Sequence, residues 1–491
     1  MKYRKPGLDF WDAWFLEADG EVHAFHMQVP DGTVPLSDAE GRSVGHLTSK
    51  DLLHWTFRGN VLEPLMDPDR PQDYHQKFTG CAFRENGVTY LYYTMRDLES
   101  CSQRIGLATS RNGYDFELWP DNPVIEPDPS VLIGYANRDR YHFDPVVDCR
   151  DLIVIKDPDS PYYYGYFAAG ADVGRTSPVG VIAVCRSTDL IHWTDQKIAY
   201  VPKTNGVIEV PDVFRIGDRW YLTVLCGANY TGRSAIPDEY VTNATLYASA
   251  DGPEGPFVQD EDCLFLGGTI GSGFTCRSVV FEGKRYVLYV DRAAGGNSLS
   301  LPKEVRLVDG CLRPCYTDRL ERLRTGEAKD LTVLPHPNSF AWHSIGGTQE
   351  TTREGITLRT EGASAHFTEL GTGEAAHWEV VCDTEIRATG AGITFYMDGQ
   401  PYTVSLEPSK GRILLLKTYT MDFVAGRELN RPQKNRFALR VLVMDGVLEA
   451  YLDDVLLLQA AVPKTAHVVP GLFCENGCAD FGQLRVFTLE S

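Results

Sequence analysis

The sequence predicts an all-β protein in which a five-bladed β-propeller is followed by a β-sandwich. Three observations carry this prediction. Short apolar hairpins recur through the first two-thirds of the 491-residue chain, a polar residue stands eight positions ahead of each hairpin turn, and a second strand motif follows most hairpins. Regular repetition of short hairpins is typical of propellers, whose blades are four-stranded sheets.

Each hairpin carries β-branched and aromatic residues on both arms of a tight turn. The turn residues tolerate positive φ or bond to their own backbone, as hairpin turns require. The polar residues eight positions ahead of the turns are Asp12, Thr79, Asp151, Glu209 and Thr275. Equivalent positions on the innermost strands of a propeller converge on its central funnel. Three carboxylates there would be costly to bury without a chemical role, so they predict a functional site.

The second motif is a strand that ends at a serine and leads through a polar turn to an aromatic residue. It follows the first four hairpins, with its serine at Ser49, Ser110, Ser187 and Ser249. Two hairpins per unit make a four-stranded blade, and five such units end near residue 325. We therefore expect a propeller domain over residues 1–325.

The remainder of the chain has another pattern. Residues 326–344 are charged and then Pro-containing, and we predict a linker there. Over 345–491, short alternating strands are separated by Gly and Asp turns, which is typical of a β-sandwich. The sandwich could bind sugar, support the propeller, or form a homo-oligomer contact.

Composition limits the partners. The formal net charge of -20 argues against a nucleic acid or an anionic membrane as a partner. The start of the chain has no apolar segment typical of a secretory signal, and we expect a cytoplasmic location. The twelve cysteines fit reduced, buried thiols better than disulfides, and their spacing predicts no metal site. We expect no cofactor.

The three phased acids suggest glycoside hydrolysis. Cleavage with retention needs two carboxyl groups roughly 5 Å apart, one to attack the anomeric carbon and one to protonate the leaving oxygen. A third carboxylate raises the pKa of the acid and can bind sugar hydroxyls. Asp12, Asp151 and Glu209 supply three such groups.

Five motifs of the N-terminal region resemble glycoside hydrolase family 32, the invertases, levanases and inulinases. Gln28 follows Asp12 by sixteen residues, as the Gln of that family follows its nucleophile. The other motifs are VGHLTSKDLLHW at 44–55, FTGCAFRENGVTYLYYT at 78–94, CRDL at 149–152 and EVPDVF at 209–214. Their order and spacing agree with the family over roughly residues 10–220.

The resemblance implies a role for each acid. Asp12 would be the nucleophile, Glu209 the acid/base and Asp151 the transition-state stabiliser. Arg150 would bind sugar hydroxyls, with Gln28 in the same subsite.

Further residues are candidates for the sugar-binding site. Thr79 matches a sugar-contacting serine of the family, and Trp11 and Phe78 are sugar-stacking faces or core residues. Asp144, within HFDPVVD, competes with Asp151 as the third acid, and either Asp144 or His142 could line the pocket.

The chain also departs from the family motifs. The nucleophile segment is DFWDAWF at 9–15, with Trp11 in place of an Asn, and it looks more like the levansucrases of family 68. Leu152 and Val210 replace a Pro and a Cys. These changes touch the sugar-binding residues and leave the acids in place.

The sequence therefore predicts a retaining hydrolase of terminal β-D-fructofuranosides such as sucrose, fructo-oligosaccharides or fructans. Three alternatives are an inverting arabinofuranosidase-like enzyme on the same propeller, a fructosyltransferase, and a non-catalytic carbohydrate-binding propeller.

Overall fold

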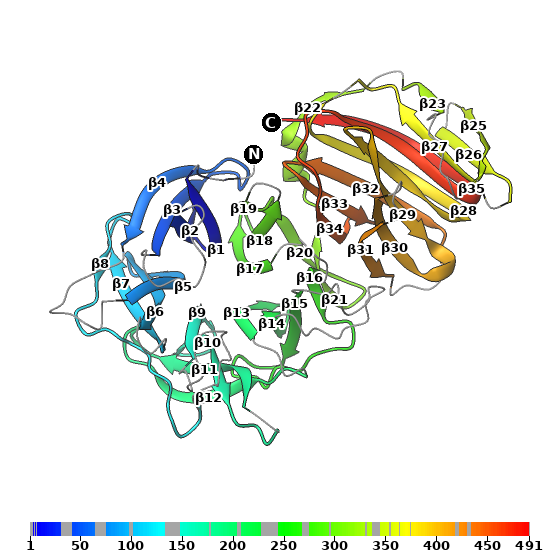
Figure 1. Ribbon diagram of the computed structural model, residues 1–491. Coiled ribbons are helices and arrows are strands. Elements are labelled where there is room, and N and C mark those ends of the chain that lie inside the picture. The colour runs from blue at the N-terminus through cyan, green and yellow to red at the C-terminus, as the bar shows by residue number, and fades with distance from the viewer. Residues whose placement is uncertain are drawn as a thin grey trace.

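In the computed structural model, the hairpins of the N-terminal region form sheets arranged in a ring, and a larger sheet domain follows (Figure 1). The structure describes residues 3, 5, 7–30, 42–63, 75–97, 102–132, 148–175, 178–203, 208–226, 244–267, 274–293, 296–328, 331–335, 344–352, 355–362, 364–373, 375–417, 422–429 and 434–490.

Four separate sheets of four strands each are formed by consecutive strands. The first holds β1 (Leu8–Ala18), β2 (Glu21–Pro30), β3 (Ser43–Ser49) and β4 (Thr56–Leu62). The second holds β5 (His75–Glu85), β6 (Val88–Asp97), β7 (Gln103–Ser110) and β8 (Glu117–Leu118). The third holds β9 (Cys149–Lys156), β10 (Tyr163–Ala171), β11 (Val179–Ser187) and β12 (Thr194–Tyr200). The fourth holds β13 (Ile208–Ile216), β14 (Arg219–Cys226), β15 (Ala244–Ala250) and β16 (Leu264–Gly267).

The predicted all-β class is confirmed, but the structure shows four separate blades where five were predicted. The next strands are β17 (Phe274–Phe281), β18 (Lys284–Ala293), β19 (Gly296–Leu299), β20 (Lys303–Val308) and β21 (Cys311–Cys315). They do not form a separate sheet, because β21 pairs with β34 of the C-terminal part at Cys315 and Val455. The main-chain hydrogen bonds therefore continue from this set into a 19-stranded sheet.

The C-terminal part is built from the remaining strands of that sheet. These are β22 (Arg324–Glu327), β23 (Val333–Pro335), β24 (Ser344–Ile345), β25 (Gly347–Thr351), β26 (Gly355–Thr360), β27 (Ser364–Leu370), β28 (Trp378–Met397), β29 (Gln400–Glu407), β30 (Arg412–Lys417), β31 (Asp422–Glu428), β32 (Arg436–Met444), β33 (Val447–Leu452), β34 (Val455–Ala461) and β35 (Val468–Leu489). The two longest, β28 and β35, pair antiparallel along nearly their whole length.

Helix is scarce in the described part of the chain. It contains two short 3-10 helices, η3 (Asp318–Leu323) and η4 (Pro408–Lys410). Among these residues, no helix has the length and hydropathy needed to cross a bilayer.

The tight turns follow the predicted chemistry. Both residues of the Asp19-Gly20 turn have positive φ, 56° and 78°, and those of the Asn86-Gly87 turn have 50° and 77°. Two consecutive positive φ angles define the type I′ turn that matches the twist of a hairpin.

The serine motif is a structural repeat. The Ser49 hydroxyl accepts the main-chain N–H of Leu52 at 2.9 Å, and the Ser187 hydroxyl accepts that of Leu190 at 2.9 Å. These bonds close the turns after β3 and β11 and satisfy backbone donors that the strands leave free.

The first strand of each small sheet, together with β17, lies nearest the centre of the ring (Figure 1). β1 contacts β5 and β17, while β9 and β17 both contact β13. Each of these strands also has a register shift near the polar residue that stands eight positions ahead of its hairpin turn. In β1 the shift lies at Phe10/Ala13, and in β13 it lies at Glu209/Asp212. The shifts in β5, β9 and β17 adjoin Thr79, Asp151 and Thr275. A β-bulge re-aims a side chain, so these bulges give the phased residues their common direction.

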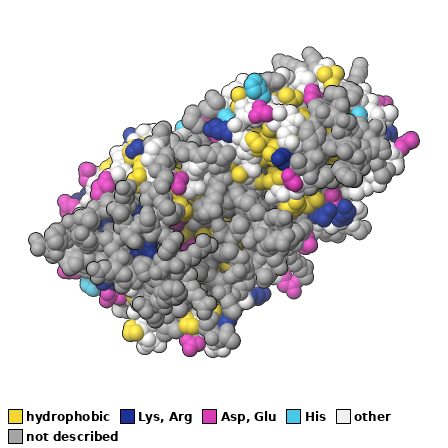
Figure 2. Space-filling model, in the orientation of Figure 1, with side chains coloured by type: hydrophobic (Ala, Val, Ile, Leu, Met, Phe, Trp, Pro, Cys, Tyr) yellow, Lys and Arg dark blue, Asp and Glu magenta, His cyan; other side chains and the backbone are white. Residues whose placement is uncertain are grey.

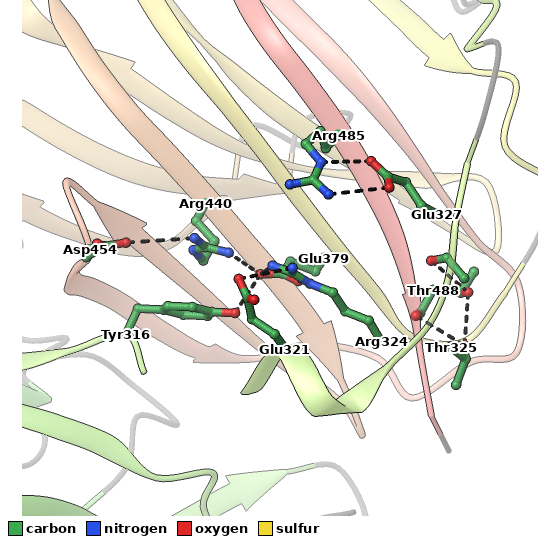
Figure 3. Close-up of polar contacts among 11 residues, drawn as sticks. Tyr316, Glu321, Arg324, Thr325, Glu327, Glu379, Arg440, Asp454, Arg485 and Thr488 are labelled. Atoms are coloured by element: carbon green, nitrogen blue, oxygen red, sulfur yellow. Dashed lines mark hydrogen bonds and ion pairs between the residues drawn. The ribbon is translucent and has the colours of Figure 1, made fainter. Parts of the chain in front are cut away.

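The C-terminal sheet packs on the β17–β21 set through an interface that contains buried ions. Glu379 on β28 is 1% exposed, and Arg324 donates to it at 2.6 Å (Figure 3). Arg440 and the Tyr316 hydroxyl also donate to this carboxylate. Apolar residues of both parts surround the cluster, including Tyr289, Tyr316, Leu442, Tyr451 and Leu489.

A second buried ion pair joins the two parts directly. Lys303 on β20 is 0% exposed and lies 2.9 Å from Glu449 on β33. The hydroxyls of Tyr289 and Tyr451 donate to the same carboxylate. Because each charge is removed from water, each depends on the other.

The distribution of acidic side chains and the burial of the cysteines follow what the composition predicts. In the view of Figure 2, acidic side chains are spread around the molecule and do not gather in one patch. Of the eleven cysteines in the described part, nine are buried, as predicted for core thiols.

We predict that Lys303→Met destabilises the protein by about 3–5 kcal/mol, because Glu449 would remain buried without its cation. Urea unfolding followed by circular dichroism measures the change. The control is Lys197→Met, whose ion pair with Glu254 is 51% and 36% exposed; its effect should stay within about 0.5 kcal/mol. Equal effects of the two substitutions would contradict the prediction.

Candidate active site

Asp12 lies in the bulge of β1 and is partly buried. The Thr79 hydroxyl on β5 donates to its Oδ2 at 2.6 Å. Burial raises the pKa of Asp12, whereas the Thr79 hydrogen bond, the nearby Thr275 hydroxyl and the positive charge of Arg277 lower it. Three inner strands, β1, β5 and β17, therefore define the surroundings of this carboxylate.

Asp151 lies in the bulge of β9 with a φ of 60°, which is uncommon for a residue other than glycine. Its main-chain N–H donates to the Thr94 hydroxyl at 3.0 Å, and its Oδ2 accepts the N–H of Val210 at 3.0 Å. Its carbonyl oxygen accepts from Arg277 at 2.7 Å. Bonds from three neighbouring strands thus hold both the strained backbone and the carboxylate.

Glu209 lies just before the bulge of β13, and its side chain is 41% exposed. Arg150 Nη2 donates to its Oε1 at 3.3 Å. The same guanidinium lies 2.9 Å from Asp148 and 3.6 Å from Asp151. One buried arginine therefore contacts or adjoins three carboxylates.

The acids influence one another electrostatically. Burial raises the pKa of Asp151 to about 7, and the charges of Glu209 and Asp12 add to this effect while Arg150 opposes it. Burial also raises the pKa of Glu209, with Asp12 adding to the shift and Arg150 opposing it. Arg150 lies 3.6 Å from Asp151 and 3.3 Å from Glu209, and the charge of Asp12 acts on both acids, so the three predicted acids share one region of the structure.

The predicted binding residues lie around this cluster in part. Gln28 is 2% exposed and donates to Ser43 and Asn60, at 3.0 and 2.6 Å. Phe78, next to Thr79, is partly buried, with the Arg42 guanidinium 4.3 Å from its ring centroid.

The other candidate pocket residues are Trp11, His142 and Asp144. Trp11 packs partly buried against an apolar cluster between β1 and β17, which fits the core role that the sequence left open. His142 and Asp144 lie outside the described residues.

Sequence reasoning missed three charged residues of this region: Arg42, Asp148 and Arg277. Asp148, just before β9, lies 2.9 Å from Arg150, and this i, i+2 spacing was visible in DCRD. Arg277 follows the phased Thr275 by two residues and is 1% exposed. No local pattern distinguished Arg42.

The described residues contain no group of three or more His, Cys, Asp or Glu side chains placed to hold a metal ion. The carboxylates described above are instead arranged around arginine.

Comparison with known proteins assigns the family. The model of the Glycosyl hydrolases family 32 N-terminal domain matches residues 14–265, just over half of the 491 residues. The chain belongs to glycosyl hydrolase family 32. The matched range includes Gln28, Asp151 and Glu209 and begins two residues after Asp12.

Individual relatives of this family 32 protein cover nearly the whole chain. Sucrose-6-phosphate hydrolase from Escherichia coli is 23% identical over 95% of this chain and 88% of its own length. The protein of that name from Pediococcus pentosaceus is 29% identical over 89% and 79%. The exo-inulinase structure from Aspergillus awamori has a TM-score of 0.70 at 16% identity, covering 100% of this chain and 98% of its own. That structure shows a shared fold.

We predict that Asp151→Asn flattens the pH dependence of stability. The pKa of Asp151 is about 7 in the folded protein, against 3.8 for an ordinary aspartate. The folded state therefore binds the proton more tightly than the unfolded state. Stability should fall as pH rises from about 4 to about 7, and the variant should lack this contribution.

Urea midpoints measured between about pH 4.5 and 7.5 test this prediction. Asp218→Asn, at a fully exposed carboxyl, is the control and should keep the wild-type dependence. An Asp151→Asn curve parallel to the wild-type curve would show that Asp151 does not titrate in this range.

Proposed function

We propose that this family 32 glycoside hydrolase cleaves terminal β-D-fructofuranosides, such as sucrose, fructo-oligosaccharides or fructans, with retention of configuration. The observation that carries the proposal is the gathering of the acids on the inner strands: Arg150 adjoins both Asp151 and Glu209, and the charge of Asp12 acts on both of these acids. The family match and the names of the relatives agree with fructofuranoside hydrolysis.

In the first step, the Asp12 carboxylate attacks the anomeric carbon while Glu209 protonates the leaving oxygen. Burial keeps the pKa of Glu209 raised, so this group can hold a proton to donate. In the second step, Glu209 removes a proton from water, which attacks the fructosyl ester on Asp12. The 41% exposure of the Glu209 side chain fits contact with both leaving group and water.

The remaining residues would bind the sugar. In its ionised form, Asp151 would accept hydrogen bonds from hydroxyls and stabilise the developing positive charge, with Arg150 beside it donating to other hydroxyls. Gln28 would bind in the same subsite, and Phe78 would present an apolar face with Thr79 holding the nucleophile.

The proposed architecture is a five-bladed propeller, in which β17–β21 is the fifth blade, followed by a β-sandwich. Its support is that β17 contacts both β1 and β13, between the first and fourth sheets. We propose a propeller over residues 1–325, a linker over 326–344 and a sandwich over 345–491. β22 and β23 at the linker already pair with β35 and β27.

The cytoplasmic location stays a prediction, for which the nine buried thiols are the support. Homo-oligomer formation through the sandwich also stays a prediction.

A second candidate substrate is a phosphorylated fructoside. The guanidinium groups of Arg42 and Arg96 lie 4.3 and 5.7 Å from the centroid of the Phe78 ring. Burial, together with repulsion from Arg96, lowers the pKa of Arg42 to about 10, while Asp12 opposes the shift. Two cations beside Phe78 would favour an anionic substrate group, and the two relatives described above are named sucrose-6-phosphate hydrolase.

We predict that Asp12→Ala and Glu209→Ala each lower sucrose turnover at least about a hundredfold. On an aryl β-fructofuranoside whose leaving group needs no proton, Glu209→Ala should retain far more activity in the first step than Asp12→Ala. Fructose release from sucrose, kestose, inulin and levan is measured, with an aryl α-L-arabinofuranoside tested beside them.

The alternatives give other results in the same assays. Anomer-resolved NMR of the first product distinguishes retention from inversion, and fructosyl oligomers would indicate transfer. Cleavage of only the arabinofuranoside would show that the enzyme acts on arabinofuranosides and not on fructofuranosides. Sugar binding without turnover would favour a carbohydrate-binding propeller.

We predict that Arg42→Met lowers kcat/KM for sucrose 6-phosphate by about 10–100-fold, the effect of losing one charged hydrogen bond. The loss for sucrose should be markedly smaller. Arg58→Met, which removes a cation that is 40% exposed and paired with Glu21, is the control. Equal losses of kcat/KM for the two substrates would argue against the phosphate role.

A further inference from the structure

Arg277 on β17 is a buried cation beneath the three acids. Its side chain is 1% exposed, and it is among the largest fully buried side chains of the protein. In the described part of the chain, its Nε and Nη1 have no hydrogen-bond partner. A charge in such a position needs a reason, because burying a charge with unsatisfied donors costs free energy.

Its one bonded nitrogen reaches the backbone of the neighbouring acid strand. Nη2 donates to the carbonyl oxygen of Asp151 at 2.7 Å and is 3.4 Å from that of Leu152. Asp151 has a φ of 60°, so its peptide orientation is held against the ordinary preference of the backbone. The bond from Arg277 holds the peptide group that follows Asp151, and the Thr94 hydroxyl holds the peptide group that precedes it.

The same guanidinium acts on Asp12 through its charge. The positive charge of Arg277 lowers the pKa of Asp12 against the effect of burial. Cys81 and Cys276, both buried, lie close enough to respond to it as well. In surroundings with little water, a charge acts over a longer distance than at the surface.

We propose that Arg277 is a positioning residue of the active site: it fixes the Asp151 main chain and places a buried positive charge in the region of the acids. The proposal rests on the function proposed above, in which Asp12 attacks as an anion. Arg150 and Arg277 then have separate roles, since Arg150 adjoins the carboxylates of Asp151 and Glu209.

The sign of the effect on pH dependence follows from the charge. Removing a positive charge raises the pKa of Asp12, so a higher pH is needed to ionise the nucleophile. The other charged groups that act on Asp12 are Arg42 and the acids Asp151 and Glu209, and they remain in the variant. The acidic limb of the kcat/KM profile should therefore move to higher pH.

The test compares Arg277→Met, Arg277→Lys and wild type, using sucrose hydrolysis between about pH 4 and 8. For Arg277→Met, we expect the acidic limb to move up by about one pH unit, as for loss of a nearby opposite charge. For Arg277→Lys, the limb should stay near its wild-type position, because the charge is retained. Its kcat should still fall several-fold, because an ammonium cannot reproduce the guanidinium contact with two carbonyls.

The matched control is Arg285→Met on β18. Arg285 is partly buried, lies over the Phe214 ring at 4.4 Å and donates to Ser278. This substitution removes an arginine that bonds none of the three acids, so the acidic limb should not move. Circular dichroism and thermal unfolding show whether each variant folds, and Arg277→Gln replaces Arg277→Met if the latter does not.

An Arg277→Met profile with an unmoved acidic limb would overturn the proposal, as would an Arg277→Lys limb displaced as far as that of Arg277→Met. Failure of the proposed function looks different: Asp12→Ala and Glu209→Ala would then keep wild-type turnover. If those two variants are inactive and only the Arg277→Met profile is unchanged, the function stands and the role of Arg277 does not.

Discussion

The site depends on the guanidinium of Arg150, which is 8% exposed among three acids. Asp148, just before β9, lies 2.9 Å from Arg150 on β9, but regular strand alternation would turn Asp151 to the side opposite Arg150. The bulge at Asp151 breaks that alternation. As a result, one strand supplies both the cation and a carboxylate 3.6 Å from it, and Glu209 joins from β13.

Bulges at the same position of five strands give the site its shape, and they bring a cost in backbone strain. Asp151, Val210 and Thr275 all have positive φ, for which a cost of about 1–3 kcal/mol each is typical. Bonds between neighbouring strands offset this strain. The N–H of Val210 reaches the Asp151 carboxylate, so the bulge of one strand is held by the bulge of the next.

The C-terminal sheet extends the same hydrogen-bonded structure outward. β21 pairs with β34, while Lys303 and Glu449 form an ion pair inside the interface. Such an interface resists sliding, because any shift would leave a buried charge without its partner. The β17–β21 set, which carries Thr275 and Arg277, is thereby held between the site and the C-terminal part.

The sequence by itself determined the all-β class, the hairpin repeat and the three acids, because turn chemistry and strand periodicity are local properties. It also placed Thr79, which proved to bond Asp12. The tertiary structure decided that β17–β21 joins the C-terminal sheet, that Trp11 packs partly buried against an apolar cluster, and that Arg277 reaches Asp151 from 126 residues away. These features depend on which distant strands become neighbours, and burial and charge compensation between such strands leave no periodic signal in the chain.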